Sequence, residues 1–212
     1  SGLADLARAG IAGTIAGAWL RTLDQALAAT PRPDLVWSGP EIPGLPARRT
    51  GRAFDDLIAE ACRSIWVSTY AIYDGPRAFG SLADRMAAIP ALRVTLLLNI
   101  KRARNDTTAP KILVSRFASR FWSYEWPGPL RPSVYYDPRS VDLDAHASVL
   151  HAKALVVDDC AALVTSANLT EAAHTRNIEL GLLLRDAALA QSISTHFRAL
   201  IDQDILRSLP EA

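Results

Sequence analysis

This sequence has few cysteines, a small net charge and no long uncharged run. The shortage of cysteine limits the metal sites that the chain can form. Only Cys62 and Cys160 occur among the 212 residues, and neither has a second Cys or His at the spacing of a zinc site. The sequence therefore offers no candidate metal ligands, and we expect neither a metal nor a cofactor. With so little cysteine, we expect a reducing location, the cytoplasm.

The charges of the chain nearly cancel. There are 23 Lys and Arg residues against 22 Asp and Glu residues, which gives a formal net charge of +1. A protein devoted to nucleic acid usually carries a basic excess over the whole domain. Any contact with nucleic acid must therefore come from a local basic patch.

Uncharged runs are short, although apolar residues are plentiful. The uncharged stretch 9–20 is shorter than a membrane span requires and lacks the basic leader of a secretion signal, so we expect a helix and no stable membrane insertion. Apolar residues make up 50% of the chain and charged residues 21%, which excludes disorder. A chain of this length can bury the core of one α/β domain with a small helical appendage.

Two segments divide the chain. Residues 3–29 place an apolar side chain about every four positions, which predicts one long helix or two short ones. Residues 31–46 contain five prolines and two glycines, a composition that stops helices and breaks strands. We therefore expect an N-terminal helical extension and proline-rich connector over residues 1–45, and a main domain over residues 46–212.

The main domain alternates helical and strand patterns, which predicts an α/β fold with helices covering a sheet. Helical spacing of apolar residues marks 54–61, 79–89 and 189–205. Continuously apolar, β-branched or aromatic runs mark strands at 64–72, 92–100, 133–136, 149–157, 161–164 and 178–184. A short helix is expected at 168–175, with Asn168 or Thr170 as its N-cap.

Polar side chains in these apolar strands mark a candidate site. In the expected strand 149–157, alternation puts His151 and Lys153 on one face. After the next strand, backbone N–H groups and the Asn168 amide can face an anion. Glu179 lies in an otherwise apolar strand, where an unpaired charge is costly, so we expect a partner and consider an imidazole the best candidate.

Other polar and aromatic residues have structural interpretations. Strand geometry carries Asp158 to the opposite face, roughly 23 Å from His151. We expect Asp158 to make a structural contact at the end of its strand. The remaining histidines and nearby aromatic residues are expected on the surface, in helices or in the core, and these are His146, His174, His196, Trp66, Tyr70 and Tyr73.

The spacing of the candidate site resembles a known signature. His151-x-Lys153, four residues, Asp158, six residues and then Thr165-Ser166-x-Asn168 is similar to the HKD motif of the phospholipase D superfamily. Asn177-x-Glu179 is similar to the carboxylate site that follows this motif. The stretches WSGPEIPGLPARRT, LHAKALVVDD and SANLTEAAHTRNIELGLL also resemble the DrmC family, the phospholipase D-like component of bacterial DISARM anti-phage systems.

This resemblance implies a mixed sheet sandwiched between helices, with residues 46–212 as a metal-independent catalytic domain. It implies that His151 attacks phosphorus to form a phosphohistidine, and that Lys153 and Asn168 stabilise charge on the phosphate oxygens. Ser166 would support the phosphate loop and Glu179 would orient the imidazole. Because the chain has one signature and the reaction needs a second histidine as acid, the resemblance also implies a homodimer that pairs two HKD motifs.

Nucleic acid, and DNA in anti-phage defence in particular, is the leading substrate on this resemblance. Residues 101–120 contain six basic residues and one acidic residue, and aromatic residues follow at 121–126. Charge next to aromatic rings is typical of single-strand binding, although a solvated helix face above packed aromatics explains the stretch equally well. The candidate substrate-binding residues are Lys101, Arg102, Arg104, Arg116 and Arg120.

Two alternatives stay open. The first is a phospholipid hydrolase. The second is a weakly active or regulatory subunit that works with other DISARM components. Thr165 favours the second alternative, because the superfamily usually has glycine there and a side chain restricts the approach of the backbone to a phosphate.

Overall fold

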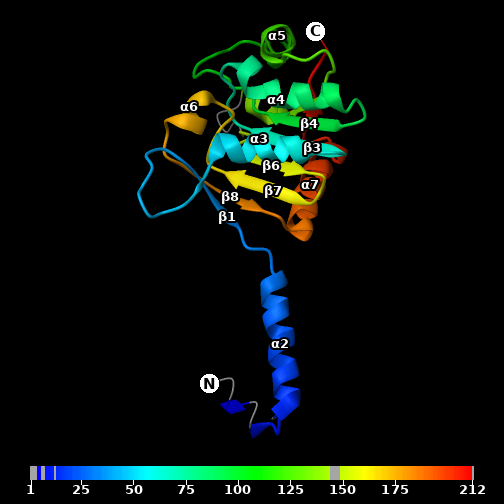
Figure 1. The fold of residues 1–212 in the computed structure, drawn as a ribbon. Helices are drawn as coiled ribbons and strands as arrows, with labels where there is room; N and C mark the ends of the chain where they lie inside the picture. Colours follow the sequence, from blue (N-terminus) through cyan, green and yellow to red (C-terminus); the bar gives the residue numbers. More distant parts are fainter. Residues whose placement is uncertain (1–3, 6–7, 12, 144–148, 212) are drawn as a thin grey trace. The chain divides into compact units, whose positions relative to one another are not determined.

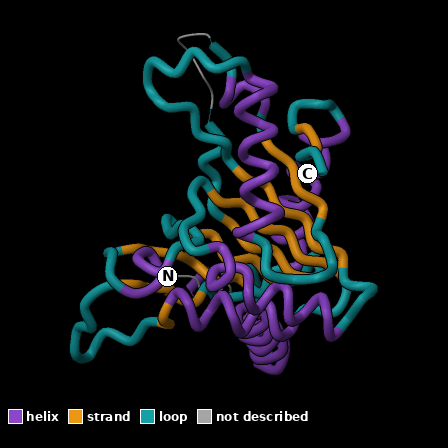
Figure 2. The backbone as a smooth tube through the Cα atoms, turned by 90° about the horizontal axis from the view of Figure 1, so that it is seen from above, coloured by secondary structure: helices purple, strands orange, loops and turns teal. Residues whose placement is uncertain are grey.

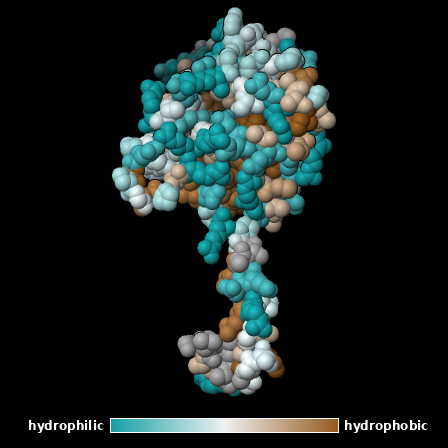
Figure 3. All heavy atoms as spheres, viewed as in Figure 1, coloured by the Kyte–Doolittle hydropathy of each residue, from teal (hydrophilic) through white to brown (hydrophobic). Residues whose placement is uncertain are grey.

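The computed structural model describes residues 4–5, 8–11, 13–143 and 149–211, and the chain forms two compact units, residues 1–32 and 33–212. The first unit contains helix α2 (Gly13–Ala29). Several large apolar side chains of α2 are exposed, among them Ile15 and Leu27, and Figure 3 shows hydrophobic atoms along the helix. None of the described helices is long and apolar enough to cross a membrane.

The second unit is built on one sheet of nine strands. In sequence order they are β1 (Asp34–Ser38), β2 (Arg48–Arg49), β3 (Ser64–Thr69), β4 (Arg93–Leu98), β5 (Ser133–Tyr136), β6 (Ala154–Val157), β7 (Ala161–Thr165), β8 (Glu179–Leu184) and β9 (Arg207–Ser208). Their order in the sheet is β2-β1-β8-β7-β6-β3-β4-β5-β9 (Figure 1). The strands β3, β4 and β5 are parallel, whereas β3–β6, β6–β7 and β7–β8 are antiparallel pairs.

Helices lie on both faces of this sheet (Figure 2). They are α3 (Thr50–Glu60), α4 (Gly75–Ala88), α5 (Pro110–Arg120), α6 (Glu171–Thr175) and α7 (Ala187–Asp202), with a π-helical turn at Phe121–Glu125 and a 3-10 turn at Pro138–Val141. The larger core joins the sheet to α3, α4 and α5, while α7 packs on the other face against Trp66 and Val156. The expected mixed α/β sandwich is confirmed.

The proline-rich stretch contributes more to the sheet than its composition suggests. Between Pro33 and Pro40 the chain has no proline, and these residues form β1, which pairs with β8 on one side and β2 on the other. The second compact unit therefore begins at Pro33, whereas the sequence placed residues up to 45 in the extension.

Strand β6 is shorter than expected. The sequence predicted a strand from residue 149, but β6 begins at Ala154. Before it, polar side chains replace part of the strand ladder: Asn99 Oδ1 accepts from the Leu150 N–H at 3.2 Å, and the Ser68 hydroxyl donates to the Ala152 carbonyl at 2.9 Å. The segment 150–153 is therefore held by side chains next to β3 and β4.

Candidate active site

The five predicted catalytic residues come together at one end of the sheet. Strands β6 and β8 begin there and β7 ends there, because consecutive antiparallel strands reverse direction. His151 and Lys153 immediately precede β6, Ser166 and Asn168 follow β7, and Glu179 is the first residue of β8.

Lys153 and His151 are in direct contact. The Lys153 ammonium lies 3.2 Å from His151 Nδ1 and 3.4 Å from Nε2, and it donates to the His151 carbonyl at 2.8 Å. Lys153 is only 8% exposed, whereas His151 is exposed. Burial lowers the pKa of Lys153, and the nearby charge of Glu179 opposes this effect. The pair thus places a shielded cation beside an accessible imidazole.

The Tyr70 ring packs beside His151 and Lys153. Tyr70 was not predicted as a site residue. Its ring centroid lies 4.8 Å from that of His151, with the planes tilted by 55°. The Lys153 ammonium lies 5.7 Å from the centre of the same ring. Tyr70 is the first residue after β3, and the position after a parallel strand is the signal that would have identified it.

The loop after β7 differs from the expected phosphate seat. Most of its backbone N–H groups already have partners within the protein, which corrects the expectation that they face an anion. The bonds are Thr165 N to Lys153 O at 3.1 Å, Ser166 N to Leu180 O at 2.9 Å, Ala167 N to Thr165 Oγ1 at 3.1 Å and Leu169 N to Thr69 Oγ1 at 3.1 Å. A phosphate at this loop would therefore be contacted mainly by side chains.

Thr165 is itself one of these partners. Its hydroxyl accepts from the Ala167 N–H and donates to the Leu180 carbonyl at 3.2 Å. Its side chain lies over Gly181, where an added Cβ would come within 2.9 Å of the Thr165 Cβ. The threonine is thus built into the loop, and it occupies an N–H group that a glycine at this position would leave available.

Asn168 is anchored through its carbonyl oxygen. Asn168 Oδ1 accepts from the Ala71 N–H at 3.2 Å, which ties the loop to the residues after β3. Among the described residues, no hydrogen bond uses Asn168 Nδ2. This amide donor remains available for a phosphate oxygen.

Glu179 has different partners from the one expected. Its carboxylate accepts from the Ser166 hydroxyl, and Asn177 Nδ2 donates to its other oxygen at 3.3 Å. The sequence favoured an imidazole as partner, but within the described part of the single chain the carboxylate holds the loop after β7. Ser166 thus links the loop after β7 to Glu179. The Leu180 N–H also donates to the Ser166 hydroxyl at 3.1 Å.

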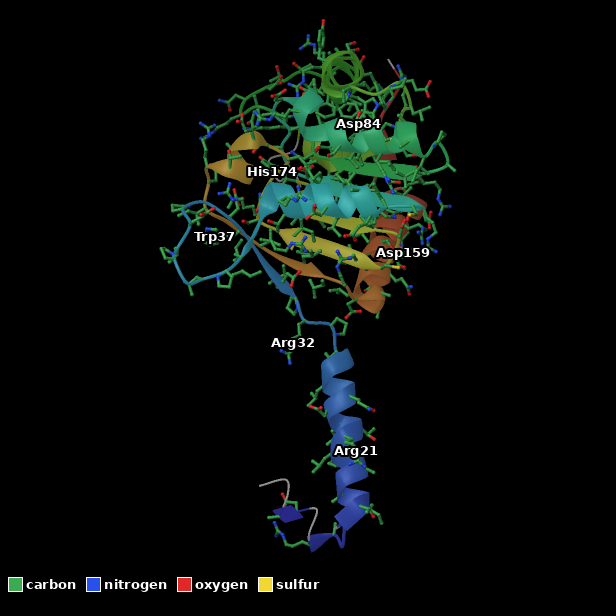
Figure 4. All side chains as sticks on the ribbon, viewed as in Figure 1. Arg21, Arg32, Trp37, Asp84, Asp159 and His174 are labelled. Atoms are coloured by element: carbon green, nitrogen blue, oxygen red, sulfur yellow. The ribbon has the colours of Figure 1, made fainter. Side chains whose placement is uncertain are left out.

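Asp158 lies at the other end of the sheet, in the turn between β6 and β7. Its carboxylate accepts from the N–H groups of Cys62, Arg63 and Ser64 at 2.7–2.8 Å, as expected for a structural contact. Figure 4 labels its neighbour Asp159 at the opposite end of the sheet from His174 on α6. His146 lies outside the described residues.

In the basic stretch 101–120, some of the predicted substrate-binding residues form bonds within the protein and others are exposed. Arg102 donates to the carbonyls of Val141, Asp106 and Thr108, and it therefore orders a loop. Arg120 pairs with Glu125 at 3.3 Å. The remaining three predicted residues, Lys101, Arg104 and Arg116, are exposed.

The aromatic residues of this stretch mainly pack. Phe121 and Trp126 are buried in the larger core, and Trp122 donates to the Pro210 carbonyl at 2.9 Å. Only Tyr124 is strongly exposed, at 74%. The packing interpretation therefore holds for most of these rings. Within the described residues, no group of three His, Cys, Asp or Glu side chains is placed to hold a metal ion.

Comparisons with known proteins identify the family and the fold. Residues 54–201 match the family described as "Cardiolipin synthase, PLD-like domain". The fold is similar to Nuc from Salmonella typhimurium, a phospholipase D family member, with a TM-score of 0.54 and 18% identity over 86% of this chain and 100% of that chain. No curated protein sequence matches the chain.

Two further structures share the fold. NucT from Helicobacter pylori has a TM-score of 0.52 and 14% identity over 82% of this chain and 97% of its own. Phosphatidylserine synthase from Haemophilus influenzae Rd KW20 has a TM-score of 0.52 and 16% identity over 85% of this chain, which corresponds to 40% of the synthase.

Proposed function

Because the chain belongs to the PLD-like domain family, we propose that it is a metal-independent phosphodiesterase that acts on nucleic acid, with DNA as the substrate. The observation that carries the proposal is the contact of the buried Lys153 ammonium with the exposed His151 ring. This pair supplies a nucleophile and a fixed positive charge at the same point.

In the proposed reaction, a ring nitrogen of His151 attacks phosphorus and the bond to the leaving oxygen breaks. Lys153 and the free Asn168 Nδ2 stabilise the charge on the non-bridging oxygens. The leaving oxygen takes a proton from a second histidine. That histidine then accepts a proton from water as the water hydrolyses the phosphohistidine, which restores both residues.

The second histidine is supplied by a second copy of the chain. Support comes from an apolar face of the sheet that α7 leaves uncovered. We call it the uncovered face; its members Leu35, Val164, Ile178, Leu180 and Leu182 are each at least 44% exposed. Leu182 pairs with Leu35 in β1 and with Val164 in β7, so the residues are neighbours across three strands. A continuous apolar surface of this kind is typical of an interaction site.

The uncovered face also reaches the catalytic end of the sheet. Leu180 exchanges hydrogen bonds with Ser166, whose hydroxyl is bound to Glu179. Two chains that meet where this face borders the Ser166 loop would bring their HKD motifs toward one another. The homodimer would thereby complete each site.

The nucleic-acid substrate and a role in anti-phage defence rest on the resemblance to the DISARM component. The exposed Lys101 and Arg104 add local positive charge, which the neutral molecule otherwise lacks. In this role the chain would work in the cytoplasm beside other DISARM components.

Three substrates separate the proposals: a single-stranded oligonucleotide, bis(4-nitrophenyl) phosphate and phosphatidylcholine vesicles. We expect the purified protein to cleave the first two in the presence of chelator, and His151→Ala to remove this activity while its melting temperature is kept. Cleavage of phosphatidylcholine alone would indicate a lipid hydrolase. Loss of all activity in chelator would overturn the metal-independent reaction.

A weakly active or regulatory subunit is the second candidate. The Thr165 hydroxyl favours it because this group occupies the Ala167 N–H. Replacement by glycine releases that N–H for phosphate. An inactive wild type together with an active Thr165→Gly variant would support this second candidate over the first.

A further inference from the structure

A cavity of about 470 Å³ lies beside His151, and none of the catalytic steps above uses it. Its walls include Tyr70 after β3, Asn99 after β4, and the loop 100–107 that follows. The volume is in the range of pockets that hold small ligands. The cavity is therefore large enough for a chemical group attached to a phosphodiester that is bound at His151.

Two contacts connect this cavity to the catalytic residues. Tyr70 lines it while its ring lies 4.8 Å from the His151 ring. Asn99 lines it while accepting from Leu150 N at 3.2 Å, one residue before His151. A ligand in the cavity and a phosphate at His151 would thus share one wall.

Asn99 carries an unused donor. Its side chain is 7% exposed, and its Nδ2 is buried without a hydrogen-bond partner among the described residues. Buried donors in folded proteins are nearly always paired, so this one is suited to an acceptor on a bound ligand.

The charges of the cavity favour a neutral ligand. Arg102 lines it, but its guanidinium is bound to backbone carbonyls. Lys101 and Arg104 also line the cavity, and their charges balance those of Asp106 and Asp142. Because these charges cancel, the cavity has no excess charge for a second phosphate, and its amides and hydroxyls suit a neutral ring with both donors and acceptors.

We propose that this cavity binds one unpaired nucleobase next to the scissile phosphate, with Asn99 Nδ2 as the hydrogen-bond donor to the base. The inference rests on the proposed nucleic-acid substrate and adds a preference for single strands. A base in a duplex uses its polar edge for pairing and cannot also enter the cavity. Lys101 and Arg104, exposed on the same loop, would contact the adjacent backbone.

The first test uses the wild-type protein with single strands of ten nucleotides in which each position in turn is abasic. Fluorescence anisotropy measures the affinity. We expect one position to weaken binding by roughly tenfold, the value of one hydrogen bond and its packing, and the others by less. Equal affinity for all abasic strands would overturn the proposal. Because this test measures binding, it remains informative even if no diester is cleaved.

The second test compares Asn99→Asp with wild type. Aspartate keeps the acceptor for the Leu150 N–H and removes the donor. We expect the ratio of kcat/KM for the oligonucleotide to kcat/KM for bis(4-nitrophenyl) phosphate to fall by roughly tenfold. An unchanged ratio would overturn the role of Asn99. The control is Thr95→Val, which lies four residues earlier within β4 and should leave the ratio unchanged.

Discussion

Lys153 is a residue whose charge the fold shields from water at a cost in stability. Its ammonium contacts the His151 ring and carbonyl, and burial lowers its pKa. A buried cation that only packed would be replaceable by an apolar side chain of similar length. The proposed reaction, in contrast, requires the positive charge of Lys153.

The first prediction tests this distinction with Lys153→Met. We expect kcat/KM to fall by about 100-fold to 1000-fold, as when other charge-stabilising donors are removed. The melting temperature should stay the same or rise, because the buried charge is removed. Thermal melting and turnover are measured together, with the exposed Lys111→Met as control. A parallel loss of folding and activity would make Lys153 structural.

Asp158 is the opposite case, a signature residue whose contribution is to stability. Burial raises the pKa of its carboxyl, but the backbone N–H groups of Ser64, Cys62 and Arg63 outweigh this and hold the pKa below 3.8. The folded state therefore favours the ionised form. Its contribution is present above the unfolded pKa and is lost as the pH falls through the folded value.

The second prediction is that Asp158→Asn lowers the free energy of unfolding at pH 7 by about 2 kcal/mol, since a charged acceptor of three N–H groups becomes a neutral one. The difference between the two proteins should shrink as the pH is lowered below 4. Urea unfolding at several pH values measures this, and turnover at pH 7 should change little. Normal stability with a severe loss of turnover would place Asp158 in the chemistry.

The helices and strands that could be predicted from the sequence are those in which the pattern of apolar residues matches the burial of the element in the fold. The apolar run before Asn99 is the buried strand β4, and the otherwise apolar run at 178–184 is β8. Strand β1 was missed because composition over sixteen residues concealed a proline-free stretch of six. Its stability comes from pairing with β2 and β8, which are distant in the sequence.

The candidate site, like the fold, could be predicted only in part from the sequence. Spacing along the chain identified His151, Lys153 and Asn168, and the structure places them at one end of the sheet. Tyr70 and Asn99 were not predicted, because their importance depends on β3 and β4 ending beside the segment 150–153. The partner of Glu179 depends likewise on the contact between the β7 loop and β8.

The third prediction concerns the strands that form the uncovered face. Leu182→Lys should leave the monomer folded, because the side chain is 44% exposed and a lysine can reach water. It should abolish the homodimer, since two added charges would be buried at the interface. Analytical ultracentrifugation measures the mass. Ile112→Lys on α5, a residue 48% exposed, is the matched control. A Leu182→Lys dimer of wild-type affinity would exclude this face as the interface.

At the scale of the whole molecule, one chain carries one stretch that resembles the HKD motif, and the proposed reaction uses two histidines. One His151 cannot hold the phosphoryl group and also donate the proton to the leaving oxygen. The described residues place no second histidine of the chain in contact with His151. His174 lies elsewhere, on α6 against Phe54.

The fourth prediction follows from this requirement and uses mixtures of wild-type protein with inactive His151→Ala protein. A mixed dimer has one histidine where the reaction needs two, so only dimers of two wild-type chains would be active. With a roughly ninefold excess of mutant, about 1% of dimers contain two wild-type chains, whereas about 10% of all chains are wild type. Activity should therefore fall toward the lower value once subunits have exchanged. Exchange is followed independently by energy transfer between labelled chains. If exchange is complete and activity still falls only in proportion to the wild-type fraction, each chain works alone and the shared site is wrong.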